Sequence, residues 1–190
     1  MRLWVKLEGA ATLVQHLAGA CGGLVPDVEA DAAGGGAKRP IKGRGIGWLA
    51  FNTARIEAGQ PLFHIDFGPD TLPHETGLLK ETVSFTKGCY LGQEIVARMH
   101  NLGHPKRVLA GLTVSPPHEG DLPIAGSQVF DTDGSTVIGA VTSSTLSPLR
   151  GNAAIALAML KWGKHQPGTM VRVPAEGKLV EGVVGPLRSL

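Results

Sequence analysis

The residues whose types and spacing could do chemistry lie in the middle of the chain, at positions 85–94. This stretch reads Phe-Thr-Lys-Gly-Cys-Tyr-Leu-Gly-Gln-Glu, and an amphipathic helical pattern starts at Gln93. A thiol just before a helix start, such as that of Cys89, faces unpaired backbone N–H groups and the positive end of the helix dipole, which both stabilise the thiolate. Lys87 would add to this stabilisation. The pattern favours a reactive thiol, although a buried small residue at a tight strand-to-helix junction would have the same spacing.

The same stretch resembles the signature of a known family. Residues 87–94 match Lys-Gly-Cys-Tyr-x-Gly-Gln-Glu at every fixed position, which resembles the YgfZ family of folate-binding proteins. That family is related to the aminomethyltransferase, or T-protein, of the glycine cleavage system. The resemblance implies that Cys89 is the functional thiol and that Lys87 is its electrostatic support. The residues implied to hold the loop or contact the folate are Tyr90, Gln93 and Glu94.

A second stretch, Arg-Ile-Glu-Ala-Gly at 55–59, resembles the Arg-x-Glu-x-Gly of folate-binding T-proteins. By this resemblance Glu57 accepts hydrogen bonds from the amino-pyrimidine edge of the pterin, for which a carboxylate has the right pair of acceptors. Arg55 is implied to act beside it. Taken without the resemblance, the two are ordinary surface charges, because residues two apart do not face each other on a helix.

Two groupings of side chains could be mistaken for metal sites. Cys89, His100 and His104 are spaced loosely like zinc ligands, but a fourth ligand is missing. The other grouping is a set of loop carboxylates with two histidines: Asp66, Asp70, Glu75, His64 and His74. Their spacing fits no common metal pattern, so we expect solvated loop charges there and no bound metal.

The first 45 residues contain two predicted elements and a connector. Residues 2–7 alternate like a strand, and residues 10–20 carry the apolar spacing of a helix. Residues 26–45 are rich in Gly and Ala and predict a loop. In the resembled family such a strand and helix follow a substantial N-terminal half, which this sequence does not contain. The resemblance therefore implies that a second chain could supply that half, or that the true start codon lies upstream of Met1.

The stretch around the Arg-x-Glu motif is predicted to change from strand to helix. Residues 45–51 form an apolar run that predicts a strand. Asn52 is placed to cap a short helix over residues 53–58, and Gly59 is placed to end it.

The C-terminal part is rich in short predicted strands separated by turns. The predicted strands are residues 108–114, 127–130, 136–143, 153–159, 169–173 and 178–184. Asp133-Gly134 between two of them is a hairpin signal. A change of composition at Ser115-Pro116-Pro117 suggests a domain boundary. Regularly spaced short strands predict a small barrel, and residues 139–143 and 155–158 resemble the C-terminal barrel of the T-protein superfamily.

Composition narrows the class of protein. The 190 residues are 43% hydrophobic and 18% charged, as in soluble globular proteins. A net charge of +2 with scattered basic residues gives no evidence for direct nucleic-acid binding. The two cysteines form no disulfide framework, and the longest apolar run is far shorter than the ~20 residues of a membrane helix. With no targeting segment visible, we expect a cytoplasmic protein without a membrane partner.

The predicted fold class is α+β. Residues 1–105 are expected to form the C-terminal part of a folate-binding domain like that of the T-protein, with α/β character. Residues 106–190 are expected to form a six-stranded antiparallel β-barrel domain.

The function implied by the resemblance is that of a YgfZ-like protein that binds tetrahydrofolate or a derivative. Such proteins act in assembly or repair of iron–sulfur clusters, and so in tRNA modification, with iron–sulfur proteins or the assembly machinery as partners. An aminomethyltransferase that transfers a one-carbon unit to tetrahydrofolate is the first alternative, and a non-catalytic fragment or interaction module is the second. T-proteins lack the motif cysteine, and nothing in 1–190 matches their catalytic aspartate, so an assembly factor is favoured over an enzyme.

Overall fold

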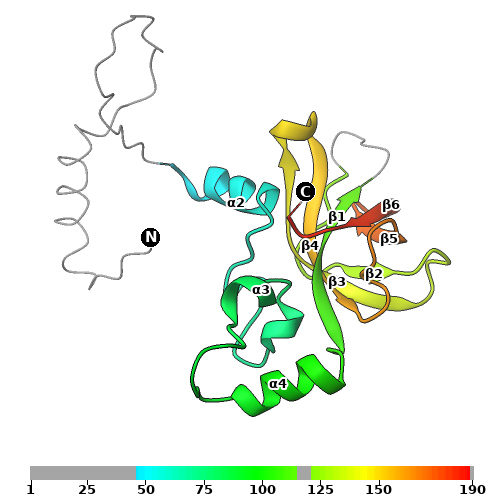
Figure 1. Cartoon of the computed structure of the whole chain (residues 1–190). Helices are drawn as coiled ribbons and strands as arrows, with labels where there is room; N and C mark the ends of the chain where they lie inside the picture. The colour runs from blue at the N-terminus through cyan, green and yellow to red at the C-terminus, as the bar shows by residue number, and fades with distance from the viewer. Residues whose placement is uncertain (1–45, 115–120, 189–190) are drawn as a thin grey trace, which may run out of the picture. The chain divides into compact units, whose positions relative to one another are not determined.

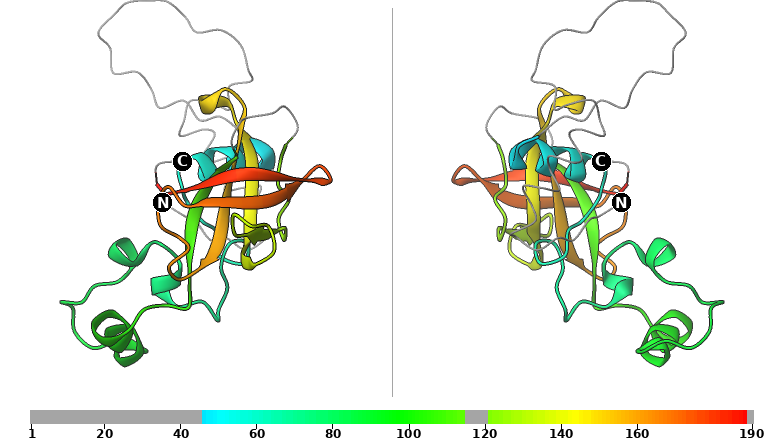
Figure 2. Two further views of the ribbon diagram at one scale, coloured as in Figure 1. Left: turned by 90° about the vertical axis from the view of Figure 1, so that its right-hand side faces the viewer. Right: turned by 90° about the vertical axis from the view of Figure 1, so that its left-hand side faces the viewer.

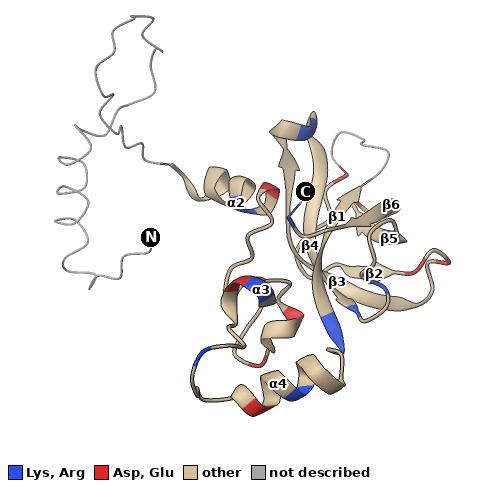
Figure 3. Cartoon of the chain, viewed as in Figure 1, with Lys and Arg blue, Asp and Glu red and all other residues tan. Residues whose placement is uncertain are grey.

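The computed structural model describes residues 46–114 and 121–188, which form a helical segment followed by a β-barrel (Figure 1). The predicted strand over 2–7 and the predicted helix over 10–20 lie outside the described residues. Within the described residues, no helix is long and apolar enough to cross a membrane. Lys and Arg positions are scattered along helices and strands rather than gathered on one element (Figure 3).

The helical segment consists of four short elements. They are α2 (Trp48–Glu57), the 3₁₀ helix η2 (Pro73–Glu75), α3 (Leu79–Thr82) and α4 (Gln93–Leu102). The strand predicted over 45–51 is wrong, because α2 already begins at Trp48. Short apolar runs suit a buried strand and a helix alike, so periodicity could not separate the two. Asn52 therefore lies inside the helix, where its Oδ1 accepts a hydrogen bond from Arg55 Nε at 2.8 Å instead of capping the helix.

The barrel contains six antiparallel strands, as predicted. They are β1 (Arg107–Val114), β2 (Gln128–Phe130), β3 (Val137–Ser147), β4 (Ala153–Lys161), β5 (Met170–Ala175) and β6 (Lys178–Gly185). They close in the order β1-β4-β3-β2-β5-β6. The hairpin predicted at Asp133-Gly134 joins β2 to β3, with Gly134 at φ +73°. The boundary suggested at 115–117 is wrong, because β1 precedes it and pairs with both β4 and β6.

The core of the barrel is centred on β4, whose residues 153–158 are all buried. Both faces of β4 can be apolar, because one face packs inside the closed barrel and the other packs against Ile56 and Leu187. Inside lie eleven buried side chains, among them Leu112, Ile138 and Leu160. Each such aliphatic side chain contributes about 1.5–3 kcal/mol by leaving water.

A second apolar cluster joins the helical segment to the barrel. Ile56 of α2 is fully buried against Leu109 of β1 and Leu157 of β4, together with Ile155 and Leu187. This contact fixes the end of α2, and with it the Arg-x-Glu motif, on the outer surface of the barrel.

Candidate functional site

The cysteine motif forms an exposed loop that leads into α4. Gly92 is the N-cap and adopts φ +86°, which favours a residue without Cβ. Gln93 and Glu94 lie in the first turn of the helix, as predicted. Cys89 is a free, exposed thiol. The alternative interpretation of a buried structural cysteine is therefore wrong.

The described side-chain contact of Lys87 is with the aromatic ring of Tyr90. Its ammonium nitrogen lies 4.7 Å from the centre of the Tyr90 ring, in cation–π geometry. Lys87 and Cys89 also line different hollows of the surface, and Tyr90 lines both. Tyr90 is thus the residue of the motif loop that contacts Lys87 and shares a hollow with Cys89.

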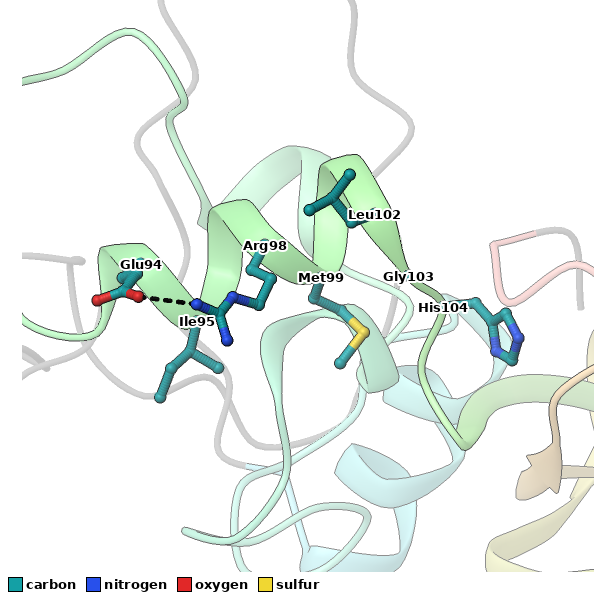
Figure 4. Close-up of a pocket in the computed structure, with 7 residues that line it drawn as sticks. All are labelled: Glu94, Ile95, Arg98, Met99, Leu102, Gly103 and His104. Carbon is teal, nitrogen blue, oxygen red and sulfur yellow. Dashed lines mark hydrogen bonds and ion pairs between the residues drawn. The ribbon is translucent and has the colours of Figure 1, made fainter.

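Three hollows surround the first half of α4, and Ile95 lines all of them. The first has a volume of about 510 Å³ and lies along the helix towards Met99 and His104 (Figure 4). Glu94 and Arg98 face each other there at 3.1 Å, as an exposed i, i+4 pair. The second, of about 380 Å³, contains Lys87, and the third, wider and about 830 Å³, contains Cys89.

Arg55, predicted beside the ligand, is buried and links α2 to Asp66 and to β3 by hydrogen bonds. Its Nη1 donates to Asp66 Oδ2 at 2.7 Å, and its Nη2 donates to Ser143 Oγ of β3 at 2.6 Å. The other oxygen of Asp66 accepts hydrogen bonds from Thr142 at 2.7 Å and from Ser143 at 2.5 Å. The pair ties α2 and the 60–66 turn to the barrel.

The expectation of solvated carboxylates is wrong for Asp66 and Glu75. Both are buried, and only Asp70 is exposed. Glu75 accepts a hydrogen bond from the backbone N–H of Leu72 at 3.2 Å and lies 3.6 Å from Arg107 of β1. A buried carboxylate needs such partners, so each is part of the structure rather than of a solvated loop.

Glu57, the predicted pterin ligand, is half-buried at the end of α2. Its Oε1 accepts hydrogen bonds from Ser147 Oγ at 2.6 Å and from the backbone N–H of Leu149 at 3.3 Å. Gly59 then ends the turn at φ +60°, and a Cβ there would collide with the backbone of Leu187. Arg55, Glu57 and Gly59 therefore each make contacts that hold the fold together. Among the three, only Glu57 has further acceptor sites with which it could bind a ligand.

The sequence analysis missed the residues of β3 that hold α2. Ser143, Thr145 and Ser147 alternate on the buried face of the strand, and Thr145 Oγ1 lies 2.8 Å from Thr53 Oγ1 of α2. The run of four hydroxyl residues over 142–145, at the end of a predicted strand, is a usable signal, because a buried hydroxyl needs a partner.

The two predicted parts of the site are not adjacent. Glu57 contacts the end of β3, whereas Cys89 precedes α4, and α2 and α4 lie apart in each view (Figures 1 and 2). No group of three or more metal-ligating side chains occurs in residues 46–114 and 121–188. His100 instead stacks on Phe85 at 4.2 Å between ring centres, and His104 stacks on Trp162 at 5.0 Å.

His74 connects η2 to α4 beneath the motif loop. Its ring centre lies 6.1 Å from that of His100, and both of its ring nitrogens are buried without a hydrogen-bond partner in the described structure. Burial, and secondarily the charge of His100, lowers the pKa of His74 below its usual value of 6.5. The η2–α4 contact therefore favours the neutral imidazole.

Comparison with known proteins identifies the barrel. Residues 107–187 match the family model of the glycine cleavage T-protein C-terminal barrel domain. The chain is 33% identical over 147 residues to the mitochondrial aminomethyltransferase of Solanum tuberosum, an alignment that covers 76% of this chain and 34% of that protein. It is 34% identical over 143 residues to the aminomethyltransferase of Chlorobium luteolum, covering 75% of this chain and 37% of that protein.

A solved structure agrees with the sequence matches. The crystal structure of glycine cleavage system aminomethyltransferase T from Bartonella henselae superposes with a TM-score of 0.63 at 27% identity, covering 74% of this chain and 38% of that one. The chain thus spans about a third of the length of the relatives it matches. The α+β class with a six-stranded antiparallel barrel is confirmed. Residues 107–187 thus form a closed barrel that matches the C-terminal barrel domain of the glycine cleavage T-protein, in a chain that is similar to aminomethyltransferases over about a third of their length.

Proposed function

We propose that this chain is a YgfZ-like protein that binds a folate and acts in iron–sulfur cluster assembly or repair through Cys89. The observation that carries the proposal is the exposed Cys89 in a glycine-bracketed loop before α4. An exposed thiol at this place is open to a partner protein or a cluster. The similarity to aminomethyltransferases supports a folate as the class of ligand.

Glu57 is the residue with which the chain would hold the folate. Its two described hydrogen bonds both end on Oε1, and a carboxylate offers about four acceptor sites. The pterin edge presents N–H donors, so the acceptor set fits. Tetrahydrofolate would supply one-carbon carrier chemistry when bound. Arg55 would contribute by fixing α2 through Asp66 rather than by touching the ligand.

Glu57→Gln tests the folate part of the proposal. The substitution keeps the size of the side chain but replaces one acceptor by a donor, so binding of tetrahydrofolate should weaken by about 1–3 kcal/mol. Isothermal titration calorimetry measures the difference. Ser147→Ala is the matched control, since it removes a hydrogen bond to Glu57 but leaves the carboxylate in place. Equal affinity of wild type and Glu57→Gln would remove this residue from the site.

An aminomethyltransferase activity is the second candidate, because the named relatives are aminomethyltransferases. The two candidates differ in their need for Cys89. We expect no methylene-tetrahydrofolate from an aminomethyl-lipoyl donor protein. We also expect Cys89→Ala to lose the rescue of cells in which cluster-dependent tRNA thiomethylation has failed. Because Cys89 is exposed, the thermal unfolding curve of this variant should match the wild type.

Both outcomes decide between the candidates. Turnover of the donor protein would favour an aminomethyltransferase, and full rescue by Cys89→Ala would favour a module without a functional thiol. Since the chain spans about a third of its relatives, we also propose that folate binding needs a polypeptide like their remaining part. The assays should be run with and without such a polypeptide added.

A further inference from the structure

The hollow that contains Lys87 differs in chemistry from its neighbours. Apolar side chains make up most of its lining: Leu72, Pro73, Val83, Leu91, Ile95 and Val96. Lys87 is the one charged residue among the residues that line it. Glu94 lines both adjoining hollows, where its carboxylate would repel an anion. Arg98 lines the first of them but is already paired with Glu94.

Lys87 is available to a ligand at the mouth of this hollow. Within the part of the chain that the structure describes, no carboxylate forms an ion pair with it, and its one described side-chain contact is the face of Tyr90. Its backbone N–H donates to Ser84 Oγ at 3.2 Å, which fixes the turn from which the side chain projects. The hydroxyl group of Tyr90 belongs to the same lining and could donate to an anion beside the ammonium, whereas Thr82 Oγ1 already donates to the backbone carbonyl of Leu78 at 2.9 Å.

We propose that this hollow binds a small organic acid with an apolar body. The volume of about 380 Å³ lies at the lower end of the range of small-molecule sites. The apolar body would lie against Val83, Ile95 and Val96, and the carboxylate would pair with Lys87. The proposal goes beyond the folate site, because Glu57 lies on α2 at the end of β3 and is not part of this lining. It does not use Cys89, which lines a different hollow.

The experiment compares phenylacetate with phenylacetamide, which have the same body and differ in charge. Binding to the whole chain is followed by ¹H–¹⁵N NMR titration. We expect phenylacetate to bind at least 10-fold more tightly than the amide, because a hydrogen bond to a charged group contributes about 1.5–3 kcal/mol. The largest shifts are expected at residues 82–96.

Variants of two lysines separate the site from general charge attraction. Lys87→Met should weaken phenylacetate binding at least 10-fold, and Lys87→Arg should retain most of it. Lys80→Met removes an exposed lysine of α3 outside the hollow and should change binding less than 2-fold. Equal binding of acid and amide, or equal losses in Lys87→Met and Lys80→Met, would overturn the proposal. Glu57→Gln should leave phenylacetate binding unchanged, so failure of the folate proposal would not affect this result.

Discussion

At the scale of single residues, the Arg-x-Glu-x-Gly motif divides two tasks among its residues. Arg55 and Gly59 hold the end of α2 on the barrel, and Glu57 carries the carboxylate that we propose binds the ligand. The guanidinium of Arg55 donates hydrogen bonds to Asp66 and Ser143. Gly59 is needed for a left-handed turn that passes close to the backbone of Leu187. Glu57 alone keeps unused acceptor sites. The resemblance had assigned Arg55 and Glu57 to the ligand together, whereas the contacts divide their tasks.

The Arg55–Asp66 pair should be essential for stability. Asp66→Ala would leave the buried guanidinium without its partner, so we expect a loss of about 3–5 kcal/mol in the free energy of unfolding. Urea denaturation measures it. The matched control is Glu94→Ala, whose partner Arg98 is exposed, and which should cost less than about 1 kcal/mol. Equal effects of the two substitutions would show that the Arg55–Asp66 pair contributes no more to the free energy of unfolding than an exposed ion pair.

At the scale of elements, the contact between η2 and α4 should depend on pH. The pKa of His74 is lowered in the folded protein, so as the pH falls below about 6.5 the unfolded or open form takes up a proton first. Stability is therefore highest above that pH and is lost as the pH falls towards the folded pKa. His100 of α4 faces His74 across this contact, and the carboxylates nearby are paired, Glu75 with Arg107 and Glu81 with Arg188.

Hydrogen exchange of the α4 amides at pH 7.5 and pH 5.5, corrected for intrinsic rates, measures this effect. We expect α4 to lose protection at the lower pH while β4 keeps it. His74→Phe fills the same space without a titrating group, and because the ring nitrogens of His74 have no described partner, the variant should fold and lose the pH dependence. The same loss of protection in His74→Phe would assign the effect to another group.

The sequence predicted the elements of the barrel better than those of the helical segment. Strands such as β4 and β6 show alternating or continuous apolar runs bounded by turn residues, which are local signals. The apolar residues that begin at Trp48 carry no local signal that separates a helix from a strand. The helix there is stabilised by the burial of Ile56 against the barrel, which the local sequence does not show. The burial of Asp66 was equally invisible, since its partners in β3 lie more than 70 positions away.

At the scale of the whole molecule, the helical segment and the barrel share one apolar cluster, so they should unfold together. Ile56→Ala opens a cavity between α2 and the barrel, and we expect it to lower the free energy of unfolding by about 2–5 kcal/mol. Leu49→Ala on the same helix is the control, because Leu49 is 76% exposed and should change stability by less than about 0.5 kcal/mol. Urea denaturation followed by tryptophan fluorescence and by circular dichroism gives both values. Separate transitions for the two probes would contradict a shared cooperative unit.

The strand order of the barrel also has a consequence for biosynthesis. β1 is the first barrel strand to leave the ribosome, yet its two neighbours are β4 and β6, and β6 is the last. At a translation rate of roughly 5–20 residues per second, β1 stays unpaired for several seconds with Leu109 and Leu112 exposed. A nascent chain stalled before β4 should therefore bind chaperones through β1 and release them once β4 and β6 have emerged.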